Sequence, residues 1–538
     1  MYGLKNIKEQ LLTTSALLLS GIAFNANATA TYDPASNTVD LPVVEVLSGG
    51  TSSFYSAQLQ LVGNELQLVS ANPIAATTGQ RNVFDSDTSA VHISSVSVGA
   101  DSYYAKLKLV PGSDPLRFSI DQLVNNAFQG CPAFAPQPGP TQNSCILSGT
   151  ITTDVTLTKN IEWILQQNVF VGGNNTQSAT LTINPGTKIV GVGGSGDQAA
   201  FLWIRRGSKI MAEGTPDNPI VMTGPNELAA GEWGGLLISG NAPVNGCNEG
   251  VPVCEVPFEA YVSEMYGGNN PADNSGVIKY TQIRFAGSPV RQDEELNGLT
   301  LNGVGSGTLI DYVQVHEGLD DGIEVFGGTV QMKHLVLTNI QDDSLDWTNG
   351  WQGRAQFVLI KQAAAIGDRG IEADSNEANN DSTPRAKPIL SNLTIIGRTG
   401  DSATQGVLLR RGTGANIWNS VITGSPTCLT IDGAATFANA GTPGSLTGSL
   451  TIQNSYVNCA TNFSDGDDAT FTTSDWFLSQ SENVAGDPLL SGYLPAAGSP
   501  LTLGGTAVSD AFFTPVDYIG AFKDADSDWT REWTTPFN

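Results

Sequence analysis

The sequence predicts an all-β protein in which a right-handed parallel β-helix solenoid follows a small antiparallel β domain. One observation is a nine-residue phrase that occurs three times, as DDGIEVFGG from Asp320, DDSLDWTNG from Asp342 and DRGIEADSN from Asp368. These copies start 22 and 26 residues apart, and a short strand repeated at such a spacing indicates a solenoid. The other observation is composition, because 60 glycines with only 14% charged residues favour short strands and tight turns over long helices.

Residues 1–28 have the layout of a secretory signal peptide. Lys5 and Lys8 come first, an apolar run follows from Leu11 to Phe24, and Ala26-Asn27-Ala28 provides small residues for cleavage. We therefore expect a secreted mature protein. No later run is long and apolar enough to cross a bilayer, so we expect the mature chain not to span a membrane.

Residues 31–125 are the predicted small β domain. FYSAQLQLVGNELQLVS from Phe54 and YYAKLKLVPGSDPLRFSI from Tyr103 each alternate apolar and polar residues, break at a glycine turn and resume as a second strand. We expect a domain of two related hairpins, with a sandwich as one arrangement of them. Residues 126–145 follow as a proline-rich connector.

The parallel β-helix is expected over residues 146–464. Gly186 and Gly207 hold the same place in two consecutive phrases, LTINPGTKIVG and LWIRRGSKIMAEG, and are 21 residues apart. After an acidic insertion at 245–275, the repeated strand phrases align in two columns and a weaker third. Each coil of such a solenoid supplies the crossover that parallel strands need. Such crossovers are right-handed.

Two further features complete the predicted solenoid. Asn392, Asn419 and Asn454 share one position in the second column, and stacked amides that bond along the axis predict a structural role for them. Residues 465–538 are expected to cap the apolar end of the solenoid. The aromatic residues expected to cover it are Trp529, Trp533 and Phe537.

Six cysteines fall into three pairs that are close in sequence. In an oxidising compartment this arrangement predicts disulfides, and none of the pairs has a zinc-site spacing or a nearby histidine. The expected pairs are Cys131 with Cys145, Cys247 with Cys254, and Cys428 with Cys459.

The net charge of −27 and a pI near 4.3 limit the classes of partner. Nucleic acids and anionic membrane surfaces need basic patches on a protein, so neither is expected as a direct partner. The acidity favours divalent cations and an extracellular setting. The alternative is that the charge only keeps a secreted protein soluble.

Several phrases resemble a known family. PGTKI, GSKIMAEGTPDNPIVMTG, GEWGGLLISGNAP, DDGIEVFGGTV, QDDSLDWTNGWQG and the YIGAF…W ending are similar to the pectin-lyase-like family of secreted right-handed β-helix proteins, over residues 145–538. More narrowly, the size, the acidity and the amino-terminal β domain resemble the β-helical surface-layer (S-layer) proteins of marine gammaproteobacteria. The resemblance implies a self-assembling coat on the outer membrane.

Superposing the three copies places Glu324, Asp346 and Glu372 in one outward-facing column. Adjacent coils are about 4.8 Å apart, so like charges there repel and need either raised pKa values or a bound cation. Many oxygen ligands without histidine or cysteine select Ca²⁺. Thr300 and Leu408 hold the same position on either side and limit the column to three coils. The candidate metal ligands are Asp320, Asp321, Glu324, Asp342, Asp343, Asp346, Asp368, Glu372 and Asp374. Without a cation, Arg369 and solvent would have to balance their charge.

Catalysis is an alternative role for this acidic column. A uronate lyase would combine Ca²⁺ with Arg369 as the base, and a hydrolase would use paired aspartates such as Asp320-Asp321 and Asp342-Asp343. Against hydrolysis, adjacent residues of a strand point to opposite faces. The arginine pairs in IRRG (205–206) and LRRG (410–411) are expected to be solvated strand ends, with a carbohydrate or lipopolysaccharide contact as the alternative.

We therefore expect a non-enzymatic, secreted protein that assembles with copies of itself into a Ca²⁺-dependent surface layer outside the outer membrane. Lipopolysaccharide or another outer-membrane component is the candidate anchor. A Ca²⁺-dependent polysaccharide lyase and a glycan-binding adhesin are the alternatives from other functional classes.

Overall fold

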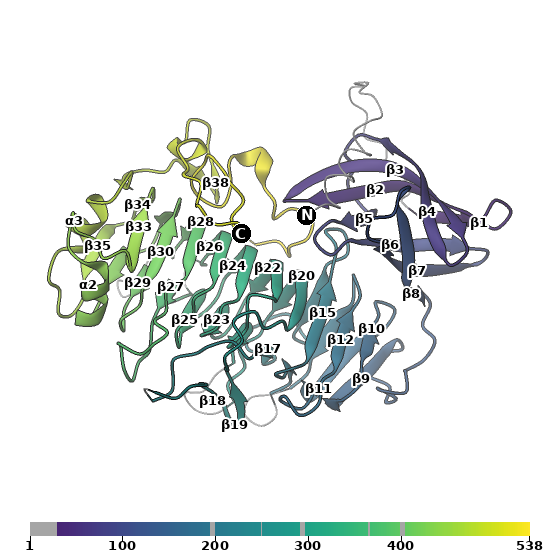
Figure 1. Ribbon diagram of the computed structural model, residues 1–538, viewed down its shortest axis with the longest axis horizontal. Coiled ribbons are helices and arrows are strands. Elements are labelled where there is room, and N and C mark those ends of the chain that lie inside the picture. The colour runs from purple at the N-terminus through teal and green to yellow at the C-terminus, as the bar shows by residue number, and fades with distance from the viewer. Residues whose placement is uncertain are drawn as a thin grey trace. The chain divides into compact units, whose positions relative to one another are not determined.

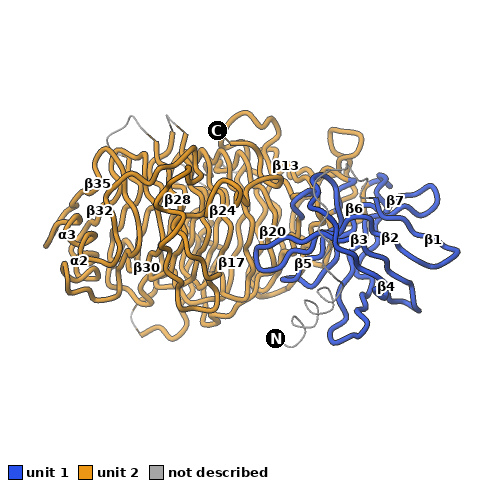
Figure 2. The backbone as a smooth tube through the Cα atoms, turned by 90° about the horizontal axis from the view of Figure 1, so that it is seen from above, with its two compact units in different colours: residues 1–130, 158–160, 215–218 blue, residues 131–157, 161–214, 219–538 orange. Residues whose placement is uncertain are grey.

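A computed structural model describes residues 29–193, 199–248, 250–290, 296–363, 366–398 and 404–537. The expected signal peptide, residues 1–28, lies outside these ranges. The chain divides into two compact units, shown in Figure 2. Unit 1 contains Met1–Gly130 with the short segments Thr158–Asn160 and Thr215–Asn218, and unit 2 contains the remainder.

Unit 1 is an eight-stranded, mostly antiparallel barrel. Its sheet has the order β1-β2-β3-β4-β8-β7-β6-β5, and parallel pairings of β1 with β6 and of β2 with β5 close it. A closed sheet leaves fewer unpaired edges than two separate sheets. The strands are β1 (Ala30–Asp33), β2 (Thr38–Ser48), β3 (Thr51–Val62), β4 (Glu65–Pro73), β5 (Asn82–Asp85), β6 (Ala90–Val98), β7 (Asp101–Leu109) and β8 (Arg117–Asn125).

The two predicted hairpins are confirmed as β3–β4 and β7–β8. The duplication extends further, because β1–β4 and β5–β8 repeat the same four-strand pattern and pair with each other symmetrically. Even the register shifts correspond, between Leu41 and Val44 in β2 and between Ile93 and Val96 in β6. The arrangement is a closed barrel, which differs from a sandwich because the short strands β1 and β5 bridge the two halves.

Unit 2 is a parallel β-helix, as predicted, with three strand columns that we call sheets A, B and C (Figure 1). Sheet A contains the second halves of β9 (Ser144–Ile151) and β11 (Glu162–Val171), then β14 (Phe201–Ile204), β17 (Gly235–Ser239), β21 (Leu299–Asn302), β23 (Ile323–Phe326), β25 (Leu345–Thr348), β27 (Arg369–Ala373), β29 (Gln405–Leu409), β32 (Thr427–Ile431) and β35 (Thr461–Asp465).

Sheets B and C share five long strands. Sheet B contains β10 (Val155–Leu157), β12 (Thr180–Ile183), β15 (Lys209–Glu213), the first halves of β20 (Gly276–Arg284), β22 (Leu309–His316), β24 (Gln331–Thr338), β26 (Arg354–Lys361) and β28 (Ile389–Ile396), then β30 (Ala415–Trp418) and β33 (Leu450–Gln453). Sheet C contains the first halves of β9 and β11, then β13 (Lys188–Gly191), β16 (Ile220–Thr223), the second halves of the five long strands, β31 (Val421–Thr423), β34 (Tyr456–Asn458) and β36 (Val484–Ala485).

One bend residue with positive φ separates the B and C halves on successive coils. Non-glycine residues occupy this region rarely, asparagine more readily than most. The bend residues are Tyr280, Tyr312, His334, Phe357, Asn392, Asn419 and Asn454. The first four stack face to face, with ring centroids 4.4, 4.1 and 4.9 Å apart. Stacking along the solenoid axis thus helps to hold a backbone conformation that aromatic residues seldom adopt.

The structural role predicted for the stacked asparagines is confirmed. The Asn454 side-chain amide donates to Asn419 Oδ1 at 2.7 Å. Asn419 Nδ2 also donates to the carbonyl of Thr506 at 2.8 Å, and its Oδ1 accepts from the Thr506 N–H at 2.8 Å. The amides therefore bond along the axis and also hold the carboxyl-terminal segment.

The carboxyl-terminal segment covers both the end and the side of the solenoid. Helix α3 (Thr473–Leu478) buries Trp476 and Phe477 near the last coil, beside β35. The chain then runs back along the long strands, drawn in yellow in Figure 1, where Trp529 and Trp533 pack edge-on against the aromatic stack. The expectation that these two tryptophans cover the end of the solenoid was therefore wrong, because their segment lies along its side. The remaining elements are α2 (Ala434–Ala440), β18 (Val256–Phe258), β19 (Tyr261–Tyr266), β37 (Leu490–Ser491), β38 (Leu494–Pro495), η2 (Pro500–Thr502) and η3 (Ala525–Ser527).

All three predicted disulfides are present. The Cα–Cα distances are 5.6 Å for Cys131–Cys145, 5.6 Å for Cys247–Cys254 and 5.5 Å for Cys428–Cys459, which are ordinary disulfide separations. In the part of the chain that the structure describes, no helix has the length and apolar character needed to cross a membrane.

Candidate functional site

Sheet A places the predicted acidic column in register. Glu324 on β23 pairs with Asp346 on β25, which pairs with Glu372 on β27. Thr300 on β21 and Leu408 on β29 continue the same position on either side. The column is therefore three coils deep, as the superposed phrases predict. Its flanking residues, such as Ile323 and Val325, are fully buried in the core of the solenoid.

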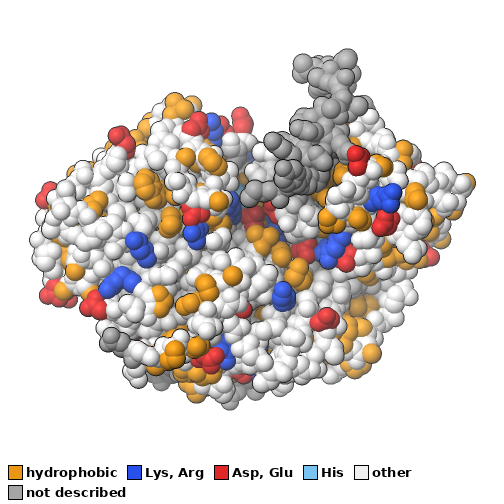
Figure 3. Space-filling model, viewed as in Figure 1, with side chains coloured by type: hydrophobic (Ala, Val, Ile, Leu, Met, Phe, Trp, Pro, Cys, Tyr) orange, Lys and Arg blue, Asp and Glu red, His pale blue; other side chains and the backbone are white. Residues whose placement is uncertain are grey.

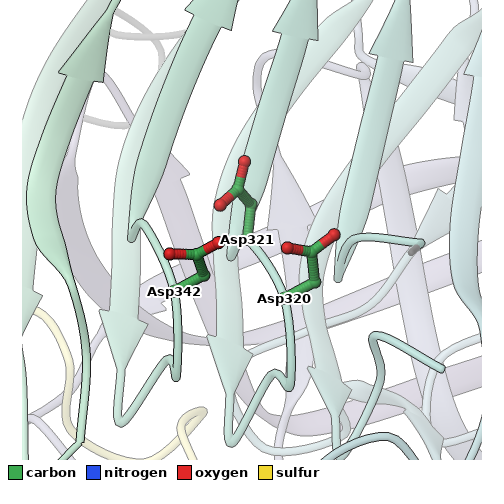
Figure 4. A group of neighbouring side chains, drawn as sticks. All are labelled: Asp320, Asp321 and Asp342. Atoms are coloured by element: carbon green, nitrogen blue, oxygen red, sulfur yellow. The ribbon is translucent and has the colours of Figure 1, made fainter. Parts of the chain in front are cut away.

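The aspartate pairs lie in the turns that lead into these strands. Asp320 and Asp321 precede β23, which begins at Ile323, and Figure 4 shows them on one coil with Asp342 on the next. Carboxylate atoms of these three residues lie within 4.8 Å of one another. The expectation that adjacent aspartates diverge to opposite faces was therefore wrong here, because strand alternation does not apply in a turn.

The carboxylates make a continuous cluster, which we call the acidic ladder. Within each of four overlapping groups, the candidate ligand atoms lie within 4.8 Å of one another. The groups are Asp320, Asp321 and Asp342; Asp321, Glu324 and Asp346; Asp342, Asp343 and Asp368; and Asp343, Asp346 and Glu372. Eight of the nine predicted ligands therefore converge, and Asp374 belongs to none of the four groups and pairs with Arg410 and Arg411.

The acidic ladder is largely withdrawn from solvent. Asp321 and Asp343 are 6% and 4% exposed, and Glu324 and Asp346 are partly buried. Burial, reinforced by the neighbouring carboxylates, raises the pKa of Asp321, Glu324, Asp343 and Asp346 well above the ordinary values. Burial also raises the pKa of Asp342 and Glu372. The side chains of the column point away from the solenoid core, but they are less exposed to solvent than side chains on an open surface.

The donor set fits a hard divalent cation. Asp346 Oδ1 is buried and has no hydrogen-bond partner among the residues described, although buried polar atoms are normally paired. All the candidate ligand atoms are carboxylate oxygens, the chemistry that Ca²⁺ prefers. The ladder residues would hold such an ion, which would supply the positive charge that the cluster lacks.

A cleft of about 580 Å³ lies over the ladder. Glu324, Asp346 and Glu372 line its floor, and Glu259 and Tyr266 line it from the insertion. The insertion is fixed in place by the Cys247–Cys254 disulfide and by two ion pairs: Arg205 to Glu264 at 2.6 Å and Arg206 to Glu255 at 2.9 Å. The arginine pair at 205–206 thus anchors this wall, rather than ending a strand in solvent.

Among the residues that the structure describes, arginines neutralise one end of the ladder and not the other. Arg410 bonds to Glu372 and, at 3.0 Å, to Asp374, and Arg411 reaches Asp374 at 2.9 Å. Arg369 lies 3.0 Å from Glu372 and 3.6 Å from Asp343. The expectation that the arginine pair at 410–411 is solvated was therefore wrong. Glu324 and Asp321 at the other end have no basic partner among the residues described.

These ion pairs weaken the case for Arg369 as a catalytic base. Nearby carboxylates, chiefly Asp343 and Glu372, raise the pKa of Arg369 above its ordinary value against the opposing effect of burial. The carboxylates of Asp374 and Glu372 raise that of Arg410 in the same way. An arginine base requires the opposite shift, toward neutrality.

Sequence reasoning missed two residues that act on the ladder and one, Tyr266, that lines the cleft over it. Asn297 Nδ2 donates to Glu324 Oε2 at 2.6 Å. Glu259 contributes to the raised pKa of Glu324, and the Tyr266 hydroxyl accepts from Asn349 at 2.9 Å. The acidic composition of the insertion was the available signal, but the sequence does not show which coil an insertion folds onto.

Comparison with known proteins supports the fold. A family model described as a pectate-lyase like beta helix domain matches residues 149–489. A search of curated proteins found no match. Among solved structures, "Crystal structure of Agl-KA catalytic domain" is similar at 12% identity, covering 70% of this chain and 72% of that one, with a TM-score of 0.24. So low a score carries no functional weight.

Proposed function

We propose that this protein, which belongs to the pectate-lyase-like β-helix domain family, is a non-enzymatic Ca²⁺-binding component of an extracellular surface layer. The acidic ladder carries this proposal. It brings eight carboxylates together, and its arginine partners in the described part of the chain lie at one end. Two ionised carboxylates at such a distance repel each other by roughly 4 kcal/mol when the effective dielectric constant is 20, the value for a site near the protein surface.

Net charge supports assembly through divalent cations. Copies that each carry a net charge of −27 repel one another, so a packed layer of this chain needs counter-ions between or within its copies. Divalent cations that neutralise the ladder would lower the charge of each copy. A layer of identical chains must also repeat one contact by symmetry.

The disulfides favour an extracellular setting for this assembly. Three bridges and no free cysteine in the described chain are typical of proteins that fold in an oxidising compartment. The expected signal peptide agrees with that setting. We propose a location outside the outer membrane on these grounds.

Electron microscopy of purified protein tests the proposal. We expect ordered sheets in millimolar CaCl₂, dispersal when EGTA is added, and recovery when Ca²⁺ is restored. Protein that stays monomeric at high concentration with Ca²⁺ contradicts the assembly proposal. If the protein binds Ca²⁺ but forms no sheets, the proposed metal site stands and the proposed surface layer is contradicted.

A carbohydrate-active enzyme is the second candidate, and the cleft over the ladder is the observation that favours it. Its volume of about 580 Å³ suits a saccharide of a few units. A uronate lyase would release unsaturated products that absorb in the ultraviolet when incubated with pectate or alginate, and Arg369→Ala would abolish them. Glycan binding without products would indicate an adhesin instead.

A further inference from the structure

The two halves of the unit 1 barrel meet in a short contact between β4 and β8. These strands pair over three residue pairs, from Glu65–Ser119 to Gln67–Arg117, whereas β8 continues to Asn125. Beyond Ser119, no strand in the described part of the chain pairs with the edge of β8 that faces away from β7. We call residues 120–125 the free edge. Such an edge offers backbone N–H and C=O groups to another strand.

Two apolar side chains of the free edge are exposed. Ile120 is 45% and Leu123 is 57% exposed, although they pair with Leu107 and Ala105 of β7, which lie in the barrel core. Directly opposed residues of antiparallel strands point to the same face, so Ile120 and Leu123 project on the core side of β8. On the face drawn in Figure 3, hydrophobic side chains reach the surface singly or in small groups. Exposure alone therefore does not distinguish these two residues, but their place on an unpaired strand edge does.

The other half of the duplicated barrel shows what covers the equivalent position. Leu68 and Ala71 on β4 correspond to Ile120 and Leu123 on β8, because each pair follows the same register shift in its hairpin. Leu68 donates its backbone N–H to the carbonyl of Leu116 at 2.8 Å, and the side chains of Leu68, Ala71 and Leu116 line one small apolar cavity. An extended apolar segment that bonds to the strand edge thus covers β4.

The hairpin turns explain why β8 lacks such a cover. Leu116 belongs to the β7–β8 turn, residues 110–116, whereas the β3–β4 turn contains only residues 63–64 and is too short to supply a counterpart. In addition, β4 ends at Pro73, and a proline protects a strand edge because it has no N–H to donate. The free edge contains no proline.

Backbone alternation shows which groups the free edge offers. Asn126 donates its backbone N–H to the carbonyl of Ser102 at 2.8 Å, so the groups of Asn126 face β7. Backbone groups alternate in direction along an antiparallel strand. The N–H and C=O groups of Val124 therefore also face β7, and those of Leu123 and Asn125 face outward.

The charges around the free edge suit a second copy of the chain. Residues 29–130 contain nine acidic and four basic side chains, so they carry a small part of the net charge of −27, and a contact there brings few like charges together. In an antiparallel pair centred on Leu123, Asp121 lies opposite Asn125 of the second copy. No two like charges then face each other across the pair.

We propose that the free edge of β8 pairs antiparallel with the free edge of a second copy, across a two-fold axis at Leu123. Leu123 of each copy would contact Leu123 of the other, and the outward backbone groups would continue one barrel sheet into the next. The contact is isologous, since the same surface serves both copies. It would be one repeating contact of the proposed surface layer, and its biological role rests on that proposal. The pairing itself needs no Ca²⁺.

Disulfide trapping of the full protein in EGTA tests the register. Leu123→Cys should give a covalent dimer on oxidation, because the two introduced cysteines face each other across the axis. Ile120→Cys is the matched control on the same strand. In the proposed register its two copies lie six residues, or roughly 20 Å, apart, so it should stay monomeric. Absence of the Leu123→Cys dimer, or equal trapping of both variants, would overturn the proposal.

Sedimentation equilibrium in EGTA tests the contact without a crosslink. Wild-type protein should dimerise reversibly, and Leu123→Asp should weaken dimerisation at least tenfold at an unchanged unfolding temperature. Leu503→Asp, at a leucine of unit 2 that is 67% exposed, should leave dimerisation unchanged. β8 has a bulge at Asp121, a feature that can prevent edge pairing. A wild-type protein that is monomeric at all concentrations would show that the bulge protects this edge, and equal effects of the two substitutions would exclude Leu123 from the contact. Either result contradicts the proposal, whereas sheets that form only with Ca²⁺ would leave the surface-layer proposal standing without it.

Discussion

Glu324 and Asp346 occupy directly paired positions on adjacent coils of sheet A, and burial together with the Asp346 carboxylate raises the pKa of Glu324. Asn297 satisfies one oxygen of Glu324, whereas Asp346 Oδ1 has no hydrogen-bond partner among the described residues. The two carboxyl groups can remain this close when at least one of them is protonated or when they share a bound cation.

Replacing Glu324 by Gln should stabilise the Ca²⁺-free protein at neutral pH. The change keeps the shape and the bond from Asn297, and it removes one charge from a buried acidic column, so we expect a gain on the order of 1–2 kcal/mol. Urea unfolding in EGTA measures it. Glu482→Gln, at an exposed position, is the control and should change stability by less than about 0.5 kcal/mol. A destabilised Glu324→Gln protein would contradict the account of repulsion.

The Ca²⁺-free protein should lose stability as pH rises through the raised pKa values of the ladder. Folded pKa values of Asp321, Glu324, Asp343 and Asp346 above their unfolded values mean that the folded state binds more protons in that window. Their contribution is fully present below about pH 4, the unfolded value, and declines above it. Unfolding temperatures measured against pH in EGTA check the slope, which CaCl₂ should flatten. A slope that Ca²⁺ leaves unchanged would count against cation binding at the ladder.

Replacing Arg410 by Gln should destabilise the protein by about 3 kcal/mol, because breaking a buried ion pair leaves an unpaired charge. Glu372 and Asp374 are 6% and 3% exposed, and both depend on Arg410. Urea unfolding measures the loss. Lys523→Gln is the control, since Lys523 and Asp517 pair at the surface and such pairs contribute about 1 kcal/mol or less. Equal effects of the two substitutions would contradict the assigned role of Arg410.

The register of the ladder could be predicted from sequence, and its electrostatics could not. A fixed solenoid period places Glu324, Asp346 and Glu372 in one column whatever surrounds them. The LRRG phrase contains Arg410, but the sequence does not show that Arg410 pairs with Glu372 and Asp374. That pairing depends on the path of the chain at the end of β27. The aspartate pairs were misjudged because the strand boundary at Ile323 falls just after them.

The positions of the aromatic stack can be recognised in the sequence. The phrases IKYTQI, IDYVQV, MKHLVL and LSNLTI align Tyr280, Tyr312, His334 and Asn392 at one position, so the aromatic residues hold the same place as the stacked asparagines. The return of the carboxyl-terminal segment along the side of the solenoid left no comparable pattern. Its contacts include hydrogen bonds that its backbone carbonyls accept from Gln and Asn side chains far away in sequence.

Replacing Asn419 by Ala should release the carboxyl-terminal segment. Asn419 exchanges two hydrogen bonds with Thr506 and adopts a φ of 51°, so we expect a loss of about 3 kcal/mol from hydrogen bonding and backbone strain together. In limited proteolysis, the part of the chain that follows residue 500 should be cleaved faster in Asn419→Ala than in the wild-type protein. Asn226→Ala, at an exposed position, should leave the cleavage rate unchanged. An unaltered rate for Asn419→Ala would show that other contacts hold the segment.

Ca²⁺ titration of the purified protein by calorimetry tests the central claim most directly. We predict saturable binding to the wild-type protein, at least tenfold weaker binding to Asp346→Asn, and unchanged binding to Asp101→Asn, which removes an exposed carboxylate from unit 1. Absence of Ca²⁺ binding by the wild-type protein, or equal affinity of wild-type and Asp346→Asn proteins, would contradict the assignment of the acidic ladder as a cation site.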